Sequence, residues 1–309
     1  MTDAPAVPSS LDVACHVNVF AADVSPGVFD AALAAIAAAG FTRVVLPPLD
    51  PPAADVAAIG RVLADHGLAP ITIAGGLTTH ADVGSSDDDE RAAGADLLRS
   101  VVDLTAALGG DQMNGVPYGV FGHPHAATAR DAFERAAREV GAVADYAHDQ
   151  GITMTFEVLN RYETSVVNTA AQAVEFVGLS GSEHLRIHLD TFHMAIEEAD
   201  MVEAIRVALP KLGYLELGQS GRGLLSTGVV DLEGVVTQAL DLGYDGRLGI
   251  EAFSRGILSP GASDMLAIWR EPYADGAELA ADAMRIIQRG WSQSTVGRRA
   301  HRLARSSPA

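Results

Sequence analysis

The sequence predicts an α/β fold, a closed barrel of eight parallel strands with a helix after each strand. Short apolar or β-branched runs alternate with alanine-rich segments of helical period along the whole chain. Eight such runs can be counted, and eight βα units close into a (β/α)8 barrel. Glycines recur where a helical segment gives way to the next strand. This regularity favours one barrel over two separate domains.

The expected strands are 12–20, 43–48, 69–76, 112–119, 152–159, 185–191, 213–219 and 247–253. The first helix is expected to start at Ser25, with Pro26 in its first turn, and to end at Gly40. The helix before the last strand is expected to start near Asp231 and to stop at Gly243. A doubly wound open sheet is the alternative, but no G-x-G-x-x-G follows the first strand, as a dinucleotide-binding fold would require.

The chain of 309 residues is expected to divide into a single barrel over 1–291 and a basic tail over 292–309. The tail contains four arginines and no acidic residue, in contrast to the rest of the chain. We expect it to be disordered, with a binding arm as the alternative.

Forty acidic and twenty-one basic side chains give a formal charge of -19. Such a chain repels nucleic acid and anionic lipid, so small molecules or metal ions are the expected partners. The first residues lack the features of a targeting signal, and no run reaches the roughly eighteen apolar residues of a membrane span. Cys15 is the only cysteine and is expected to be a packed thiol in a strand. A cytoplasmic protein that binds neither membrane nor nucleic acid is therefore expected.

The last four expected strands each end with a carboxylate, the residues Glu157, Asp190, Glu216 and Glu251. In a (β/α)8 barrel the chemistry lies where the strands end. Side chains alternate along a strand, so each acid shares a face with the residue two positions earlier and points toward the barrel axis. The sequence therefore predicts that these four acids, termed the acid ring below, meet at one end of the barrel.

A single acid of this kind could be a solvated strand end or half of a salt bridge. Four acids with no lysine or arginine in the same strand ends would repel one another unless a cation or protons neutralise them. We therefore expect a divalent metal. Oxygen ligands favour a hard ion over Zn²⁺, so Mn²⁺ is the expected ion, with Mg²⁺ or Co²⁺ as alternatives.

Further polar residues follow the same strands, namely Asn160, Arg161, Glu163, His193 and Arg222. A ring of polar donors around a metal suits a polyhydroxylated substrate. Simpler alternatives exist, such as an Arg161–Glu163 ion pair or His193 at a helix start. His123 and His125 follow the fourth strand and could face the substrate or the metal. His16 and His188 lie inside strands, where we expect them to pack in the barrel.

Four segments, "FEVLNRYET", "LDTFHMAIEE", "GQSGRGLLSTGVVD" and "YDGRLGIEAF", carry a resemblance to a known family. The chain resembles the xylose-isomerase-like sugar isomerase and epimerase superfamily of TIM barrels, and most closely the D-tagatose/D-allulose 3-epimerases. The likeness extends over most of the chain and is strongest from 153 to 253.

The resemblance implies that Glu157 and Glu251 bind the metal and exchange protons at the substrate carbon, one on each face. It also implies that Asp190 is a metal ligand. Three residues, Glu163, His193 and Arg222, would hold the oxygens near the reacting carbon, and His16 and His123 are further candidates for substrate contact. A homodimer or homotetramer acting on a small sugar is expected on the same basis.

Glu216 departs from the family, because its position corresponds to a histidine metal ligand in the epimerases. A glutamate can still bind metal, but it adds negative charge and could itself accept a proton. Three functions therefore remain open. They are a metal-dependent ketose epimerase or isomerase working through an enediolate, a lyase of the same superfamily acting on a 3-oxo sugar, and a non-catalytic sugar-binding homologue.

Overall fold

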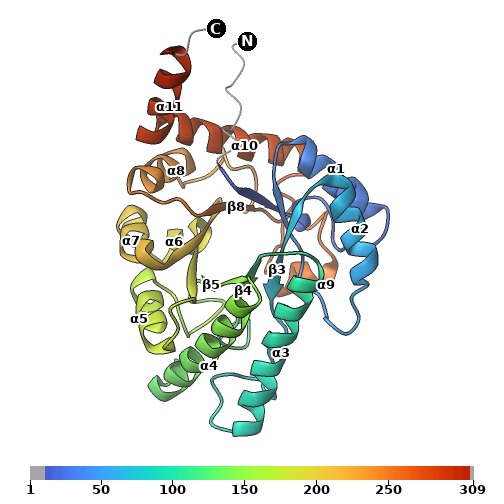
Figure 1. Cartoon of the computed structure of the whole chain (residues 1–309), viewed down its shortest axis with the longest axis vertical. Helices are drawn as coiled ribbons and strands as arrows, with labels where there is room; N and C mark the ends of the chain where they lie inside the picture. The colour runs from blue at the N-terminus through green and yellow to red at the C-terminus, as the bar shows by residue number, and fades with distance from the viewer. Residues whose placement is uncertain (1–10, 307–309) are drawn as a thin grey trace.

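The computed structural model describes residues 11–306 and contains one closed barrel of eight parallel strands in the order β1 to β8. The predicted (β/α)8 TIM barrel is therefore confirmed. The strands are β1 Val13–His16, β2 Arg43–Val45, β3 Ala69–Ala74, β4 Gln112–Gly115, β5 Thr153–Val158, β6 Arg186–Asp190, β7 Leu212–Gly218 and β8 Arg247–Glu251. Figure 1 shows these strands at the centre, with helices arranged around them.

The main helices are α1 Val28–Ala38, α2 Val56–His66, α3 Asp88–Ala107, α4 Arg130–Asp149, α5 Ala170–Ser180, α7 Met201–Ala208, α8 Leu232–Asp241 and α10 Gly276–Gln293. Two short helices follow strands: α6 Thr191–Glu197 after β6 and α9 Pro260–Met265 after β8. Single turns of 3-10 helix occupy Val17–Val19 (η1) and Leu209–Lys211 (η2). None of the helices in the described part of the chain combines the length and the apolar character that a membrane crossing needs.

Side chains that alternate in direction along the strands form two separate apolar clusters, one between the strands and the helices and one inside the barrel. Phe156, Leu189, Leu215 and Ile250 belong to the large core between strands and helices, as the positions next to the four acids predict. The barrel interior holds a small separate cluster of Ala14, Val45, Ile71 and Tyr214. The interior is therefore packed below the acids.

Some element boundaries differ from the predicted ones, for local reasons. β1 ends at His16 because the chain turns into η1, although the apolar run continues to Phe20. α1 begins at Val28 with Gly27 as its N-cap, three residues later than predicted. β2 stops before Pro47 and Pro48, which cannot donate a backbone hydrogen bond to a neighbouring strand.

The described part of the expected C-terminal tail differs from the prediction of disorder, because Thr295–Ser306 forms a helix, α11, which continues the chain beyond α10 (Figure 1). Residues 307–309 of the expected tail lie outside the described residues. The Ser294 hydroxyl caps its first turn by accepting a hydrogen bond from the Gly297 backbone N–H at 3.1 Å. The His301 ring lies against Trp291, with ring centroids 5.3 Å apart. The N-cap and the aromatic contact thus stabilise α11, although the charge of this segment alone indicated disorder.

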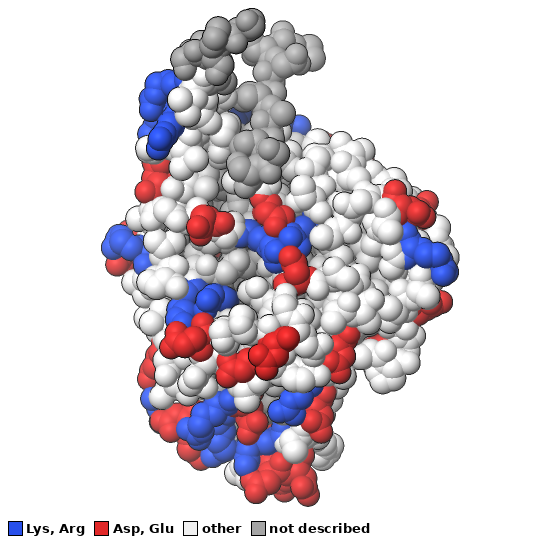
Figure 2. All heavy atoms as spheres, in the orientation of Figure 1, with Lys and Arg blue, Asp and Glu red and all other residues white. Residues whose placement is uncertain are grey.

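Acidic and basic side chains are mixed on the face shown in Figure 2, and many of both signs gather over α3 and α4.

Candidate active site at the carboxyl ends of the strands

The structure brings the four carboxylates of the acid ring together. Asp190 pairs in register with Glu216 across β6 and β7, and Gly218 pairs with Glu251 across β7 and β8. Each of the four acids offers an oxygen within 4.8 Å of the oxygens of the other three. Asp190, Glu216 and Glu251 are buried, and Glu157 is partly exposed.

Basic side chains surround the acid ring, although the ends of the strands that carry the acids contain no lysine or arginine. Arg222 comes from the loop after β7, and three histidines, His16, His188 and His193, come from β1, β6 and α6. The residues at the four strand ends do not reveal these basic neighbours. His16, His193 and Arg222 come from other elements, and His188 lies two residues before Asp190 in β6. Charge repulsion is therefore weaker than predicted and no longer demands a metal by itself.

Arg222 bridges two members of the ring. Its Nη1 donates to Asp190 Oδ2 at 3.1 Å and to Glu251 Oε2 at 2.5 Å. The guanidinium carbon lies 3.6 Å from the centre of the Phe192 ring. The backbone of Arg222 adopts the left-handed region at φ 55°, which is uncommon for a residue with a side chain. The loop is thus shaped to hold the guanidinium over Asp190 and Glu251.

Glu216 lies between two histidines. Its Oε1 is 3.0 Å from His16 Nε2, and its Oε2 is 3.1 Å from His188 Nε2. His16 also approaches Glu251, with 3.6 Å between its Nδ1 and Oε1 of that acid. His188 Nε2, His16 Nε2 and Glu216 Oε2 are nevertheless buried without a well-aligned hydrogen bond. The carboxylate that looked misplaced in the sequence therefore has two imidazole neighbours.

His188 is the main site residue that sequence reasoning assigned to packing. The available signal was its spacing, since it lies two positions before Asp190 and so on the same face of β6.

Glycine on β8 makes room for Glu216. A Cβ at Gly249 would lie 2.8 Å from Glu216 Oε1 and 2.0 Å from the Tyr214 hydroxyl oxygen. Neither position could stay as it is if residue 249 had a side chain.

A second group of polar residues lies in the loop after β5. The Asn160 backbone N–H donates to His193 Nδ1 at 3.1 Å, and the Asn160 side-chain amide donates to Glu163 Oε1 at 2.8 Å. This leaves His193 Nε2 to face Glu157 Oε1 at 3.3 Å. Arg161 pairs with Glu197 rather than with Glu163. Asn160 therefore fixes the orientation of His193.

Burial and neighbouring charges shift the pKa values of the two acids Glu157 and Glu251 in opposite directions, and they also shift the pKa of His16. Burial raises the pKa of Glu251 to about 7, against the opposing charges of Arg222 and His16. Burial would also raise the pKa of Glu157, but His188 and His193 outweigh it and hold this pKa below its usual value. Burial acts against a charged His16, yet Glu216 and Glu251 raise its pKa to about 9.

A chamber of about 440 Å³ opens beside the acids, and Glu157, Glu251, His16 and Asn18 line its polar part. The remaining wall is mostly apolar and comes from the ends of β3 and β4 and from α9. A second hollow of about 370 Å³ includes Glu163, Arg222 and Phe253, and Phe253 is shared by both. Carboxylates at the base of an apolar chamber can exchange protons with a small bound molecule.

His123 does not reach the acids. It is exposed and lines a different hollow together with His125, whose ring centroid is 6.0 Å from that of His123.

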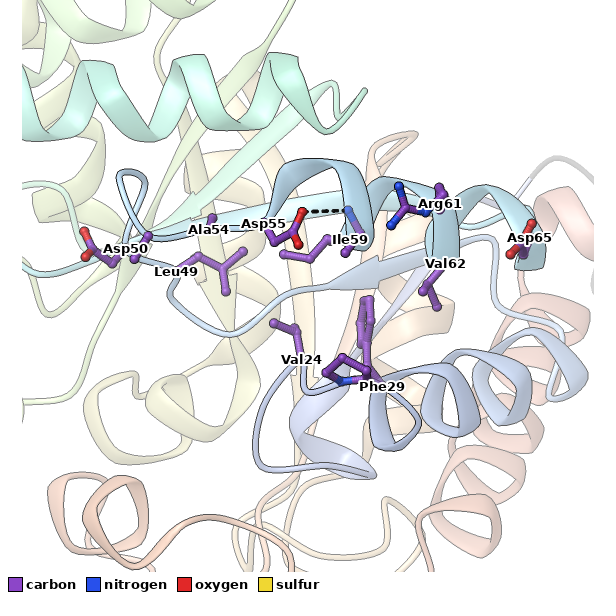
Figure 3. A pocket seen from close by; sticks show the side chains of 13 residues that line it. Val24, Phe29, Leu49, Asp50, Ala54, Asp55, Ile59, Arg61, Val62 and Asp65 are labelled. Atoms are coloured by element: carbon purple, nitrogen blue, oxygen red, sulfur yellow. Dashed lines mark hydrogen bonds between the residues drawn. The ribbon is translucent and has the colours of Figure 1, made fainter.

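A hollow of about 670 Å³ lies between α1 and α2, and no member of the acid ring lines it (Figure 3). Its Asp55 carboxylate accepts a hydrogen bond from the Ala58 N–H and so caps α2.

The residues present fit a divalent ion. Four carboxylates within mutual reach provide the oxygen ligands that Mg²⁺ and Mn²⁺ prefer. Glu216 Oε2 and His188 Nε2, at the same place, are buried and lie close together without a well-aligned hydrogen bond. Buried polar atoms without a well-aligned hydrogen bond are typical of the ligands of a metal site.

Comparison with known proteins agrees with this geometry. A profile of the xylose isomerase-like TIM barrel family matches residues 33–288. An L-ribulose 3-epimerase of Mesorhizobium japonicum is 36% identical over 297 residues, which cover 96% of this chain and 99% of the relative. A ketose 3-epimerase of Arthrobacter globiformis is 40% identical over 250 residues, or 81% of this chain and 86% of the relative.

Solved structures give the same result. The crystal structure of a D-allulose 3-epimerase from a Methylomonas species in complex with D-allulose superimposes with a TM-score of 0.86 at 34% identity, covering 91% of this chain and 97% of that one. These relatives are sugar epimerases, so the resemblance predicted from the four sequence segments is confirmed. The chain belongs to the xylose isomerase-like TIM barrel family.

Proposed function

We propose that this protein is a metal-dependent ketose 3-epimerase that inverts the configuration at C3 of a small keto-sugar. The observation that carries the proposal is the pair Glu157 and Glu251, which come from different strands, lie within 4.8 Å of each other and both line the chamber. The similarity to ketose 3-epimerases over most of the chain supports it.

The two carboxyl groups exchange protons with the sugar. One of them, as carboxylate, takes the proton from C3 on one face of the substrate, which leaves a planar enediolate. The other, as carboxylic acid, returns a proton to C3 from the opposite face and thereby inverts the centre. In the reverse reaction the roles of Glu157 and Glu251 are exchanged.

A divalent cation bound by Glu157, Asp190, Glu216 and Glu251 would acidify the C3–H bond by binding the neighbouring carbonyl and hydroxyl oxygens. Mn²⁺ is the proposed ion. Arg222, His193 and Glu163 orient the oxygens next to C3, and His16 holds Glu216 and Glu251 in place from the β1 side.

The test is solvent isotope exchange. Purified protein with Mn²⁺ in D₂O, given D-allulose, D-fructose, D-tagatose and L-ribulose in turn, is expected to yield the C3 epimer with deuterium at C3 by NMR and mass spectrometry. Lack of exchange into any ketose of this panel, with Mn²⁺ shown to be bound, would contradict the proposal.

A further inference from the structure

We propose that His188 supplies a nitrogen ligand to the metal, together with Glu157 and Glu216, and so takes over the role of a histidine that position 216 lacks. The inference rests on the proposed metal-dependent function. It concerns a residue on β6, one layer below the acid ring.

The strand register places His188 between the two acids. His188 pairs with Glu157 across β5 and β6, and with Tyr214, two residues before Glu216, across β6 and β7. Ligand atoms of Glu157, His188 and Glu216 all lie within 4.8 Å of one another. Donors from three consecutive strands, two of them members of the acid ring, therefore lie close to one another.

The contact between His188 and Glu216 has the features of two ligands rather than of a hydrogen-bonded pair. Nε2 and Oε2 are 3.1 Å apart, yet both are buried and neither makes a well-aligned hydrogen bond. Two neighbouring ligands of one ion lie at about this separation, since metal–ligand distances are about 2.1 Å and adjacent bonds are roughly perpendicular.

Arg222 already balances part of the negative charge of Asp190 and Glu251, the other two proposed ligands of the ion. Its guanidinium already contacts Asp190 and Glu251, whereas Glu157 and Glu216 face histidines. Glu216 Oε2 and both ring nitrogens of His188 are buried without a well-aligned hydrogen bond. A cation is thus needed most between Glu157, Glu216 and His188.

His16 is the other histidine next to Glu216, but its surroundings differ. It lines the chamber and approaches Glu251 through Nδ1, so it faces the substrate space. His188 lines none of the described hollows, and both of its ring nitrogens lack a hydrogen-bond partner. Its ring is fixed edge-to-face against Tyr214, with centroids 4.8 Å apart. These differences favour His188 as the ligand.

The experiment measures metal binding without substrate. Full-length protein labelled with ¹⁵N-histidine is loaded with Mn²⁺, and pulsed EPR detects histidine nitrogen coupled to the ion. The coupling is expected in the wild type, lost in His188→Gln, and retained in His16→Gln and His193→Gln as matched buried controls. Calorimetry is expected to show Mn²⁺ affinity reduced by more than the 10- to 100-fold that loss of a supporting residue typically costs.

Other outcomes separate this inference from the proposed function. Bound Mn²⁺ without histidine coupling, or coupling lost in His16→Gln instead, overturns the role of His188 and leaves the epimerase proposal standing. Coupling through His188 without C3 exchange supports the ligand and contradicts the epimerase. Absence of Mn²⁺ binding contradicts both. If His188→Gln does not fold, the wild-type spectrum still decides whether a histidine binds the ion.

Discussion

The two ends of the barrel each hold a cluster of charges, and the clusters differ in how completely their members are paired. At the amino ends of the strands, Arg43 and Arg247 each contact both Asp12 and Asp111, with N–O distances of 2.6 to 3.0 Å. Arg247 also donates to Gln112 Oε1 at 2.6 Å. Two cations meet two anions there, and every guanidinium faces a carboxylate.

At the carboxyl ends, four carboxylates meet one arginine and three histidines, and several donor atoms remain unpartnered. The amino-end cluster is partly exposed, whereas the acid ring is largely buried. The comparison shows that the same residue types form a fully paired network at one end of the barrel and the candidate active site at the other. The two clusters differ because only the buried one contains polar atoms without a well-aligned hydrogen bond.

The largest expected contrast concerns activity. Glu157→Gln and Glu251→Gln are each expected to lower kcat for C3 epimerisation by about 10²- to 10⁴-fold, because an amide cannot exchange the proton. Asp111→Asn, at the other end of the barrel, is the matched control and is expected to keep kcat within a few-fold. Circular dichroism verifies folding in all three. Comparable losses in Asp111→Asn would remove the functional distinction between the two ends.

Metal removal is expected to act on one end only. Dialysis against EDTA should abolish C3 exchange and lower the Tm, and added Mn²⁺ should restore both, since an ion that binds only the folded protein stabilises it. Asp12→Asn should leave the Mn²⁺-induced rise in Tm unchanged. An equal rise in a variant carrying both Glu157→Gln and Glu216→Gln would place the ion elsewhere.

The same carboxylate-to-amide change is expected to cost different amounts of stability at the two ends. Glu216→Gln in metal-free protein leaves His16 and His188 without their buried counter-charge and is expected to destabilise by about 3–5 kcal/mol. Asp12→Asn affects a partly exposed network and is expected to cost about 1 kcal/mol or less. Urea unfolding measures both, and equal costs would contradict the contrast.

The smallest expected effect is a pH dependence of the metal-free protein. The pKa of His16 is raised to about 9 in the fold from an unfolded value near 6.5, so its pairing with Glu216 contributes fully below pH 6.5. That contribution is lost as the pH rises through about 9. The Tm difference between wild type and His16→Gln should therefore shrink between pH 6.5 and pH 9.5. A difference that grows over this range would have the wrong sign.

The barrel could be predicted because its signals are local. Strand alternation and helix ends repeat eight times along the chain, and the acids mark the ends of the last four strands. The convergence of Glu157, Asp190, Glu216 and Glu251 follows from the period of a strand and the closure of the barrel.

The charge balance of the site could not be read in the same way. Arg222 reaches Asp190 and Glu251 only because its loop takes a left-handed backbone turn, and His16 meets Glu216 only because β1 closes against β8, itself paired with β7. The prediction of a disordered tail was wrong for a different reason, because the order of α11 depends on the local cap at Ser294 and on the nearby Trp291–His301 contact. Contacts between segments distant in the sequence decided only the charge balance of the site.

The missing side chain at Gly249 has a consequence for redesign of the site. Because the space that a Cβ would need is taken by Tyr214 and Glu216, positions 214, 216 and 249 form a single unit of substitution across β7 and β8. Gly249→Ala alone is expected to displace both the Tyr214 ring and the Glu216 carboxylate, and a shorter residue at 216 would remove only the second of these clashes. Any substitution of Glu216 is therefore constrained by Gly249, a residue that has no side chain.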